Sequence, residues 1–97
     1  MKKGDLLTVL TRLFGSKSQT KLIEYMLEQR GRVFHQAGLS RFLSMSPSTV
    51  ARIVEPLIEE KIIVYDQIGG QMKVFALNEE DEKVKVLLEF YEKIRRM

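Results

Sequence analysis

The sequence predicts an α+β fold that is mainly helical and contains one small β-hairpin. Through most of the chain, apolar residues recur at the helical period of about 3.6 residues. The period changes to 2 in residues 62–67 and 72–77, on the two sides of a Gly-Gly pair. A length of 97 residues suffices for one modest core and not for a second folded unit, so we expect a single domain over residues 1–97.

The composition argues against several kinds of site. Because the chain has no cysteine, it has no disulfide framework, thiolate nucleophile or zinc knuckle. His35 is the only histidine, and nothing stands beside it to complete a metal site or a catalytic triad. The segment GSKS at 15–18 lacks the earlier glycine that a phosphate-binding loop requires. We therefore expect no cofactor, no metal and no enzymatic activity.

The charge distribution is compatible with a polyanionic partner. The net charge is +3, and the positive excess lies in residues 1–78, whereas residues 79–97 carry a slight excess of acid. A mildly basic body suits a nucleic acid. No run approaches the roughly 18 apolar residues that span a bilayer, and Asp5 and Arg12 interrupt what would be the core of a signal peptide. We expect a cytoplasmic protein without membrane contact.

Two helices are expected before the first strand. Residues 5–14 place their apolar side chains on one face of a helix. Ser16 and Gln19 have the spacing of a capping box, and the helix that follows them is expected to run to about Arg30 and to end at Gly31.

A helix-turn-helix arrangement is predicted after a brief strand at 32–35. Residues 36–43 form a short helix whose inward-facing residues are Leu39, Phe42 and Leu43. Ser44 and Met45 provide a tight turn, and Ser46 followed by Pro47 is typical of a helix start. The second helix, about 47–60, buries one face and exposes another, with a bend expected at Pro56. The apolar face contains Val50, Ile53, Val54, Leu57 and Ile58, and the outer face contains Ser48, Thr49, Arg52 and Glu59.

The hairpin is predicted to close through a two-residue Gly69-Gly70 turn. That turn would place Asp66 opposite Lys73 across the ladder. It would also pair Val64 with Phe75 and Ile62 with Leu77. The hairpin would then have an apolar base and a polar tip, which is the composition of a projecting arm.

A last helix is expected at 79–96. Asn78 is predicted to cap it, with Asp81 at the capping-box position. Its apolar residues cover an arc wider than one core contact needs, namely Val84, Val86, Leu87, Leu88, Phe90, Tyr91 and Ile94. We therefore expect something besides its own domain to cover part of this helix.

The stretch LSRFLSMSPSTVARIVEPLIEEKIIV resembles the motif of winged helix-turn-helix transcriptional regulators of bacteria and archaea, in the superfamily that includes arsenical-repressor-like and multiple-antibiotic-regulator-like groups. The resemblance covers residues 17–78, whereas 5–14 and 79–96 are similar only to variable flanking helices. It implies a regulator that binds double-stranded DNA, with the helix 47–60 in the major groove and the wing 62–77 at the minor groove.

The resemblance also implies which residues meet DNA. Hydroxyls and lysine suit phosphates, and arginine can bind a guanine edge in bidentate fashion. The implied DNA-contacting residues are Arg41, Ser46, Ser48, Thr49, Arg52, Gln67, Gln71 and Lys73. The chain departs from a strongly basic DNA-binding protein, because the helix 47–60 has a single arginine and three glutamates and because the wing tip is uncharged.

A homodimer would compensate for two weak half-sites. We expect the last helix to pair with its symmetry mate, with help from the first helix, so that two recognition helices lie about 34 Å apart. The expected interface residues are Leu6, Leu10, Val84, Leu87, Leu88, Phe90, Tyr91 and Ile94. The alternative is a winged-helix module that binds another protein and does not read DNA. The sequence supports neither a metal sensor nor a thiol sensor, and it leaves open a small apolar ligand bound between helices.

Overall fold

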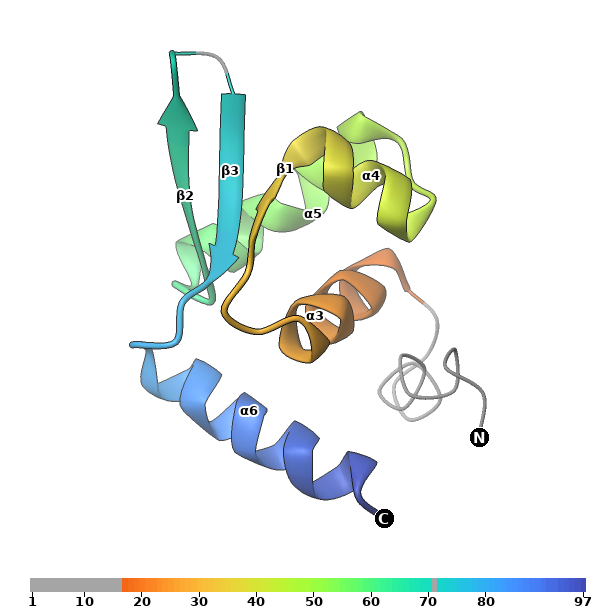
Figure 1. Cartoon of the computed structure of the whole chain (residues 1–97), viewed down its shortest axis with the longest axis vertical. Coiled ribbons are helices and arrows are strands. Elements are labelled where there is room, and N and C mark those ends of the chain that lie inside the picture. The colour runs from red at the N-terminus through yellow and green to blue at the C-terminus, as the bar shows by residue number, and fades with distance from the viewer. Residues whose placement is uncertain (1–16, 71) are drawn as a thin grey trace.

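The computed structural model describes residues 17–70 and 72–97. Its elements follow the predicted order from the second helix onward (Figure 1). They are α3 (Ser18–Glu28), β1 (Val33–His35), α4 (Gln36–Leu43), α5 (Pro47–Glu59), β2 (Ile63–Ile68), β3 (Met72–Leu77) and α6 (Glu82–Arg95). The predicted helix 5–14 lies outside the described residues.

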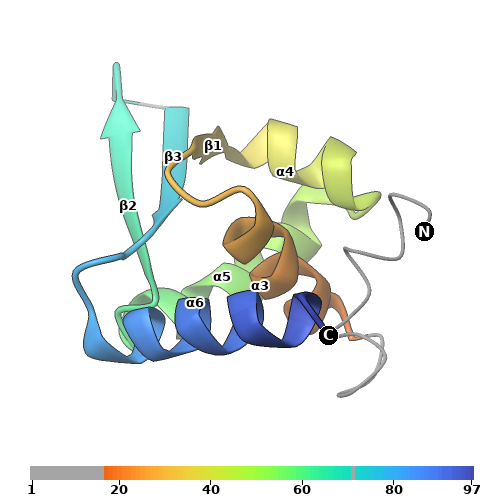
Figure 2. The same cartoon turned by 60° about the horizontal axis from the view of Figure 1, so that its bottom comes forward.

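The strands form one antiparallel sheet in the order β1-β3-β2. Residues Val33–His35 pair with Val74–Ala76, so the predicted brief strand extends the hairpin to three strands. Figure 2 shows the helices gathered on one side of this sheet, while the β2-β3 hairpin extends beyond them. We use the name wing for this hairpin, residues 63–77.

The predicted hairpin register was wrong by one residue. Ile63, not Ile62, lies opposite Leu77, and Gln67, not Asp66, lies opposite Lys73. Three residues instead of two separate the last paired positions, Ile68 and Met72. A shift of one residue exchanges the two faces of a strand, and the observed register buries Ile63 and Leu77 together in the core.

The helices before α5 differ from the prediction at Phe42. Lys17 is the N-cap of α3 and makes no capping hydrogen bond through its side chain, whereas Ser16 of the predicted capping box lies outside the described residues. Phe42 was expected inside, but 63% of it is exposed. Its ring stacks on the ring of Tyr25 from α3, with centroids 5.7 Å apart. Tyr25 is itself only partly buried, so this contact leaves most of Phe42 exposed.

The helix α5 continues through Pro56 without a break. Pro56 is exposed, so water can satisfy the carbonyl that loses its N–H partner to the proline ring. After α5, Lys61 adopts a left-handed conformation with φ 63°. The Ile62 N–H then donates to the Leu57 carbonyl at 2.9 Å, which closes the helix and turns the chain into β2.

The start of α6 differs from the prediction. Asp81, not Asn78, is the N-cap, and its carboxylate accepts hydrogen bonds from the Lys83 N–H at 2.8 Å and the Val84 N–H at 3.4 Å. Asn78 instead donates its side-chain amide to the Lys61 carbonyl at 2.8 Å. Asn78 therefore joins the two ends of the wing at its base.

A single hydrophobic core joins all the described helices to the sheet. Its buried residues are Leu22, Met26, Leu27, Phe34, Leu39, Val50, Ile53, Val54, Leu57, Ile63, Phe75, Leu77, Val84, Leu88 and Tyr91. The predicted inner face of α5 is confirmed, since Val50, Ile53, Val54 and Leu57 are buried and Ile58 is partly buried. Among the described residues, no helix is long and apolar enough to cross a membrane.

Candidate nucleic-acid interface

The start of α5 carries a compact group of hydroxyls. Ser46 caps the helix, because its Oγ accepts a hydrogen bond from the Thr49 N–H at 3.2 Å. The same oxygen lies 3.1 Å from Ser48 Oγ and 2.9 Å from Thr49 Oγ1. Ser46 and Ser48 are exposed, and Thr49 is partly buried. Three of the predicted DNA-contacting residues therefore form one hydrogen-bonded group at the helix N-terminus, where the helix dipole favours an anion such as phosphate.

Arg52 lies one turn after Thr49 on the exposed side of α5. It has no carboxylate within ion-pair distance among residues 17–70 and 72–97. The opposite face of α5 is packed into the core through Val50, Ile53 and Val54. The guanidinium is therefore available to an external partner, and it projects from a helix that the core holds in place.

The turn before α5 positions this helix against α4. Ser44 has the left-handed conformation that ends α4, with φ 55°. The Met45 N–H donates to the Ser40 carbonyl at 2.9 Å. Gln36 adds a direct link between the helices, since its side-chain amide donates to the Pro47 carbonyl at 2.9 Å. Arg41 is exposed in the last turn of α4.

His35 has a role that the sequence analysis missed. It caps α4, because its Nδ1 accepts a hydrogen bond from the Gly38 N–H at 3.1 Å. A Cβ at Gly38 would lie only 3.2 Å from His35 Cε1. A side chain at position 38 would therefore make a tight contact with the histidine ring. The sequence signal was a polar residue immediately before the helix with glycine three positions later.

The wing brings Gln67 and Lys73 together as cross-strand partners, and both are exposed. Gly69 and Gly70 have positive φ values, as predicted for the turn. The tip is not purely polar, because Ile68 and Met72 pair with each other and are 56% and 52% exposed. The predicted contact residue Gln71 lies outside the described residues.

The predicted dimer interface on α6 is divided between the core and the surface. Val84, Leu88 and Tyr91 are buried in the core of their own chain, because α6 packs on α3 through this side. These three residues therefore do not form the surplus apolar surface that was expected of them. Phe90 is 40% exposed, and Leu87 and Ile94 are partly buried. Leu6 and Leu10 lie outside the described residues.

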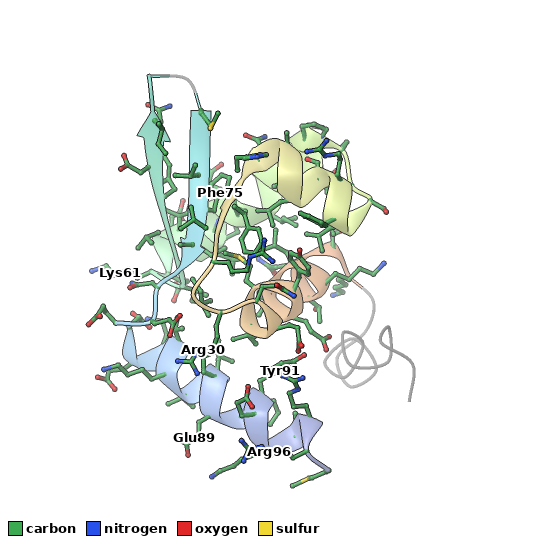
Figure 3. The ribbon with its side chains drawn as sticks, in the orientation of Figure 1. Arg30, Lys61, Phe75, Glu89, Tyr91 and Arg96 are labelled. Atoms are coloured by element: carbon green, nitrogen blue, oxygen red, sulfur yellow. The ribbon has the colours of Figure 1, made fainter. Side chains whose placement is uncertain are left out.

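A buried polar cluster holds α6 against α3. Figure 3 shows Tyr91 directed from α6 toward α3. The Tyr91 hydroxyl donates toward Glu28 Oε2 at 3.0 Å and Glu24 Oε2 at 3.4 Å. Arg95 forms an ion pair with Glu28 at 3.2 Å. Burial of the hydroxyl, reinforced by the two carboxylates, raises the pKa of Tyr91 above its usual value. None of these polar contacts was predicted from the sequence, although Glu24 lies among the apolar positions of its helix.

The described residues offer little for metal binding. No group of three or more His, Cys, Asp or Glu side chains in 17–70 and 72–97 is placed to hold a metal ion. What these residues do present is a hydroxyl-capped helix N-terminus, an arginine without an ion-pair partner among them, and a lysine-bearing hairpin.

No protein-family model and no curated protein matches the chain. Solved structures do match its fold. The chain is similar to MepR, a transcription regulator of the Staphylococcus aureus multidrug efflux pump MepA, with 17% identity, 97% of this chain covered and a TM-score of 0.66. It is also similar to MepR in a complex with DNA, with 16% identity, 94% coverage and a TM-score of 0.65.

Two further structures have the same fold. HlyU from Vibrio cholerae is 14% identical over 94% of this chain, with a TM-score of 0.65, and 90% of its own chain is covered. A MarR-family transcriptional regulator from Rhodococcus sp. RHA1 is 16% identical over 96% of this chain, with a TM-score of 0.63. The chain spans 67% of the MepR chain and 66% of the Rhodococcus chain. The protein has the winged-helix fold of these transcription regulators.

Proposed function

We propose that the protein binds double-stranded DNA as a homodimeric transcriptional regulator. The observation that carries this proposal is the exposed face of α5. There the three hydroxyls of Ser46, Ser48 and Thr49 lie one turn before Arg52, whose guanidinium has no ion-pair partner among the described residues. A helix of this kind, delivered by a tight turn and backed by a core, can enter the major groove. The structural neighbour MepR has been solved in a complex with DNA.

The proposed contacts divide between base reading and phosphate binding. Arg52 lies in the middle of the exposed face and is assigned to a base edge. Arg41, on α4, precedes α5 in the chain, and Lys73, on the wing, follows it. Both are assigned to phosphates, with Gln67 beside Lys73 at the minor groove. Gln71 remains part of the proposed wing contact.

The proposed dimer uses the outer surface of α6. Val86 is 66% exposed and Phe90 is 40% exposed, and Leu87 adjoins them. Ile62 and Leu87 line the same apolar depression between the base of the wing and α6. This surface is apolar and remains uncovered within the described part of the chain, so a second copy can bury it. Leu6 and Leu10 of the predicted first helix are proposed to extend the interface.

Selection of bound sequences from random duplex DNA tests the function directly. A two-fold symmetric sequence is the expected result, because a symmetric dimer presents two equal recognition helices. The affinity for the selected duplex should fall as salt rises, with a logarithmic slope of about −0.9 per phosphate neutralised. Recovery of no enriched sequence, together with no binding at low salt, would refute the proposal.

The dimer is tested separately by light scattering. Replacement of Phe90 by lysine places a charge in the proposed interface, and a shift from dimer to monomer is expected at micromolar concentration. Glu55→Lys is the control, because Glu55 is exposed on α5 and lies outside the proposed interface on α6. A wild-type monomer at this concentration would remove the dimer from the proposal and leave DNA binding to be judged alone.

A second function is favoured by one observation. The face of the sheet opposite the helices carries an exposed apolar rung, in which Val33 and Val64 flank Ala76 across the three strands. Val33 is 64% exposed and Val64 is 46% exposed. An apolar sheet face of this kind suits a protein partner, which is the alternative of a winged-helix interaction module. The DNA selection experiment separates the two functions.

A further inference from the structure

A cavity of about 280 Å³ lies between α5 and the inner face of the wing. Its walls are mainly apolar. Val54 and Ile58 line it from α5, and Tyr65 and Phe75 line it from the wing. The two rings lie close together, with centroids 6.4 Å apart and planes inclined by 35°. Tyr65 is 52% exposed although it points to the helical side of the sheet, which shows that the core does not fill this space.

The size of the cavity limits what it can hold. A dry apolar cavity of roughly 150 Å³ is sufficient for benzene. The cavity beside Tyr65 is larger, and it opens to solvent at its rim. A molecule of one or two fused rings therefore fits, whereas a larger ligand would have to separate the wing from α5.

The rim of the cavity selects the charge of its ligand. Glu55 and Glu59 both line the cavity and lie one helical turn apart on α5. Neither forms an ion pair within residues 17–70 and 72–97. Like charges at this spacing repel each other, and a cation between them removes that repulsion. Lys73 lines the other side, so the rim has a net negative charge.

We propose that this cavity is a binding site for a small aromatic ammonium ion. The aromatic part packs against Tyr65, Phe75 and Ile58, and the ammonium group lies between Glu55 and Glu59. The exposed Tyr65 ring adds a favourable face for the cation. An aromatic carboxylate is excluded from the same position, because it would face two glutamates.

The location of the site gives it a consequence for the wing. One wall is the helix α5 and the other is the β2-β3 hairpin. A ligand that contacts both walls fixes their separation. If DNA also contacts both elements, the affinity for the ligand and the affinity for DNA are linked by one coupling free energy. Binding of the ammonium ion itself does not depend on the DNA-binding proposal.

The test uses three probes that share a naphthalene ring and differ in charge. They are 2-naphthylmethylamine, which is a cation at pH 7, the neutral 2-naphthalenemethanol and the anion 2-naphthoate. Binding to the full chain is measured by calorimetric titration without DNA, and the site is located by amide chemical-shift changes in NMR spectra. The amine should bind on the order of tenfold more tightly than the alcohol, because two partly exposed ion pairs contribute roughly this factor.

Charge variants locate the effect. The double variant Glu55→Gln/Glu59→Gln should weaken the amine about tenfold and leave the alcohol unchanged. The matched control is Glu60→Gln/Glu80→Gln, which removes two exposed carboxylates that do not line the cavity. Replacement of Tyr65 by alanine should weaken the amine and the alcohol alike, because it removes part of the apolar wall that both probes contact.

Several results would overturn the site. They are equal binding of the three probes, absence of amine binding at millimolar concentration, and an equal loss of amine affinity in the control double variant. Chemical-shift changes confined to residues outside 51–59 and 65–75 would also overturn it. Because no DNA is present, these results leave the DNA-binding proposal to its own experiment.

Discussion

Charged side chains form ion pairs at one end of the described molecule and not at the other. On α3 and α6 and in the loops beside them, carboxylates and cations pair with one another, as Arg95 does with Glu28 and Arg30 with Glu79. Between residues 36 and 77, no charged side chain that the structure describes forms an ion pair. Arg52 and Lys73 are examples. Internal pairing thus marks the end that holds the fold together, and unpaired charge marks the end that is available to a partner.

The largest expected effect tests whether the α3–α6 end is structural. Replacement of Leu88 by alanine leaves a cavity in the core and should lower the free energy of unfolding by about 2–5 kcal/mol. Leu88 is 5% exposed, whereas the next residue on the same helix, Glu89, has an exposed side chain. Glu89→Ala should therefore change stability by no more than about 0.5 kcal/mol. Thermal and urea unfolding measure both, and similar losses in the two variants would contradict the assignment of α6 to the core.

The next effect tests the unpaired end. Arg52→Ala should weaken binding to the selected DNA by about 1–3 kcal/mol and relax the base preference. Lys73→Ala should weaken all duplexes alike and make the salt slope shallower by about 1. Fluorescence anisotropy with selected and random duplexes measures both variants, and unfolding curves check that neither loses stability. Equal losses on selected and random DNA from Arg52→Ala would contradict its role at a base edge.

A smaller effect is expected from the polar cluster. Tyr91→Phe removes the hydroxyl between Glu24 and Glu28 and should cost about 1–2 kcal/mol of stability near pH 7. DNA affinity should be unchanged at temperatures where the variant is folded. A loss of affinity without a loss of stability would show that the cluster does not act as a purely structural contact.

The same variant also tests how the stability contributed by Tyr91 depends on pH. The pKa of Tyr91 in the folded protein is raised above its usual 10.0, so the folded state retains the proton more strongly than the unfolded state. The stabilisation is complete below about pH 10 and is lost as the pH rises from there toward the folded pKa. The stability difference between wild type and Tyr91→Phe should therefore shrink above pH 10. Unfolding measured between pH 8 and pH 11 checks this, and a constant difference would contradict it.

The smallest effect concerns the His35 cap at the unpaired end. Alanine in place of a helical glycine normally stabilises by up to about 1 kcal/mol, but a Cβ at Gly38 would lie 3.2 Å from the His35 ring. Gly38→Ala should therefore raise the free energy of unfolding less in the wild-type protein than in a His35→Ser background, where a smaller capping side chain replaces the ring. A difference of about 0.5–1 kcal/mol in unfolding free energy is expected, and equal gains in the two backgrounds would exclude the steric coupling.

Much of the interface was predictable because its determinants are local. The start of α5 follows from Ser46 and Pro47, which act within the first turn of the helix. Its buried face follows from the helical period, and the structure confirms the predicted core residues of α5. The cap of α6 was harder, since Asn78 and Asp81 are both good caps. The choice depends on Lys61, whose carbonyl takes the Asn78 amide from 17 positions away in sequence.

The sequence alone determined the order of the elements, the exposed polar face of α5 and the turn glycines of the wing, because propensity, capping and period act over a few neighbouring residues. The fold decided the register of the wing, the exposure of Phe42 and the burial of Val84, Leu88 and Tyr91. It also paired Tyr91 with two carboxylates from α3. Burial depends on what packs from distant parts of the chain, and the helical period shows which residues share a face without showing what covers it.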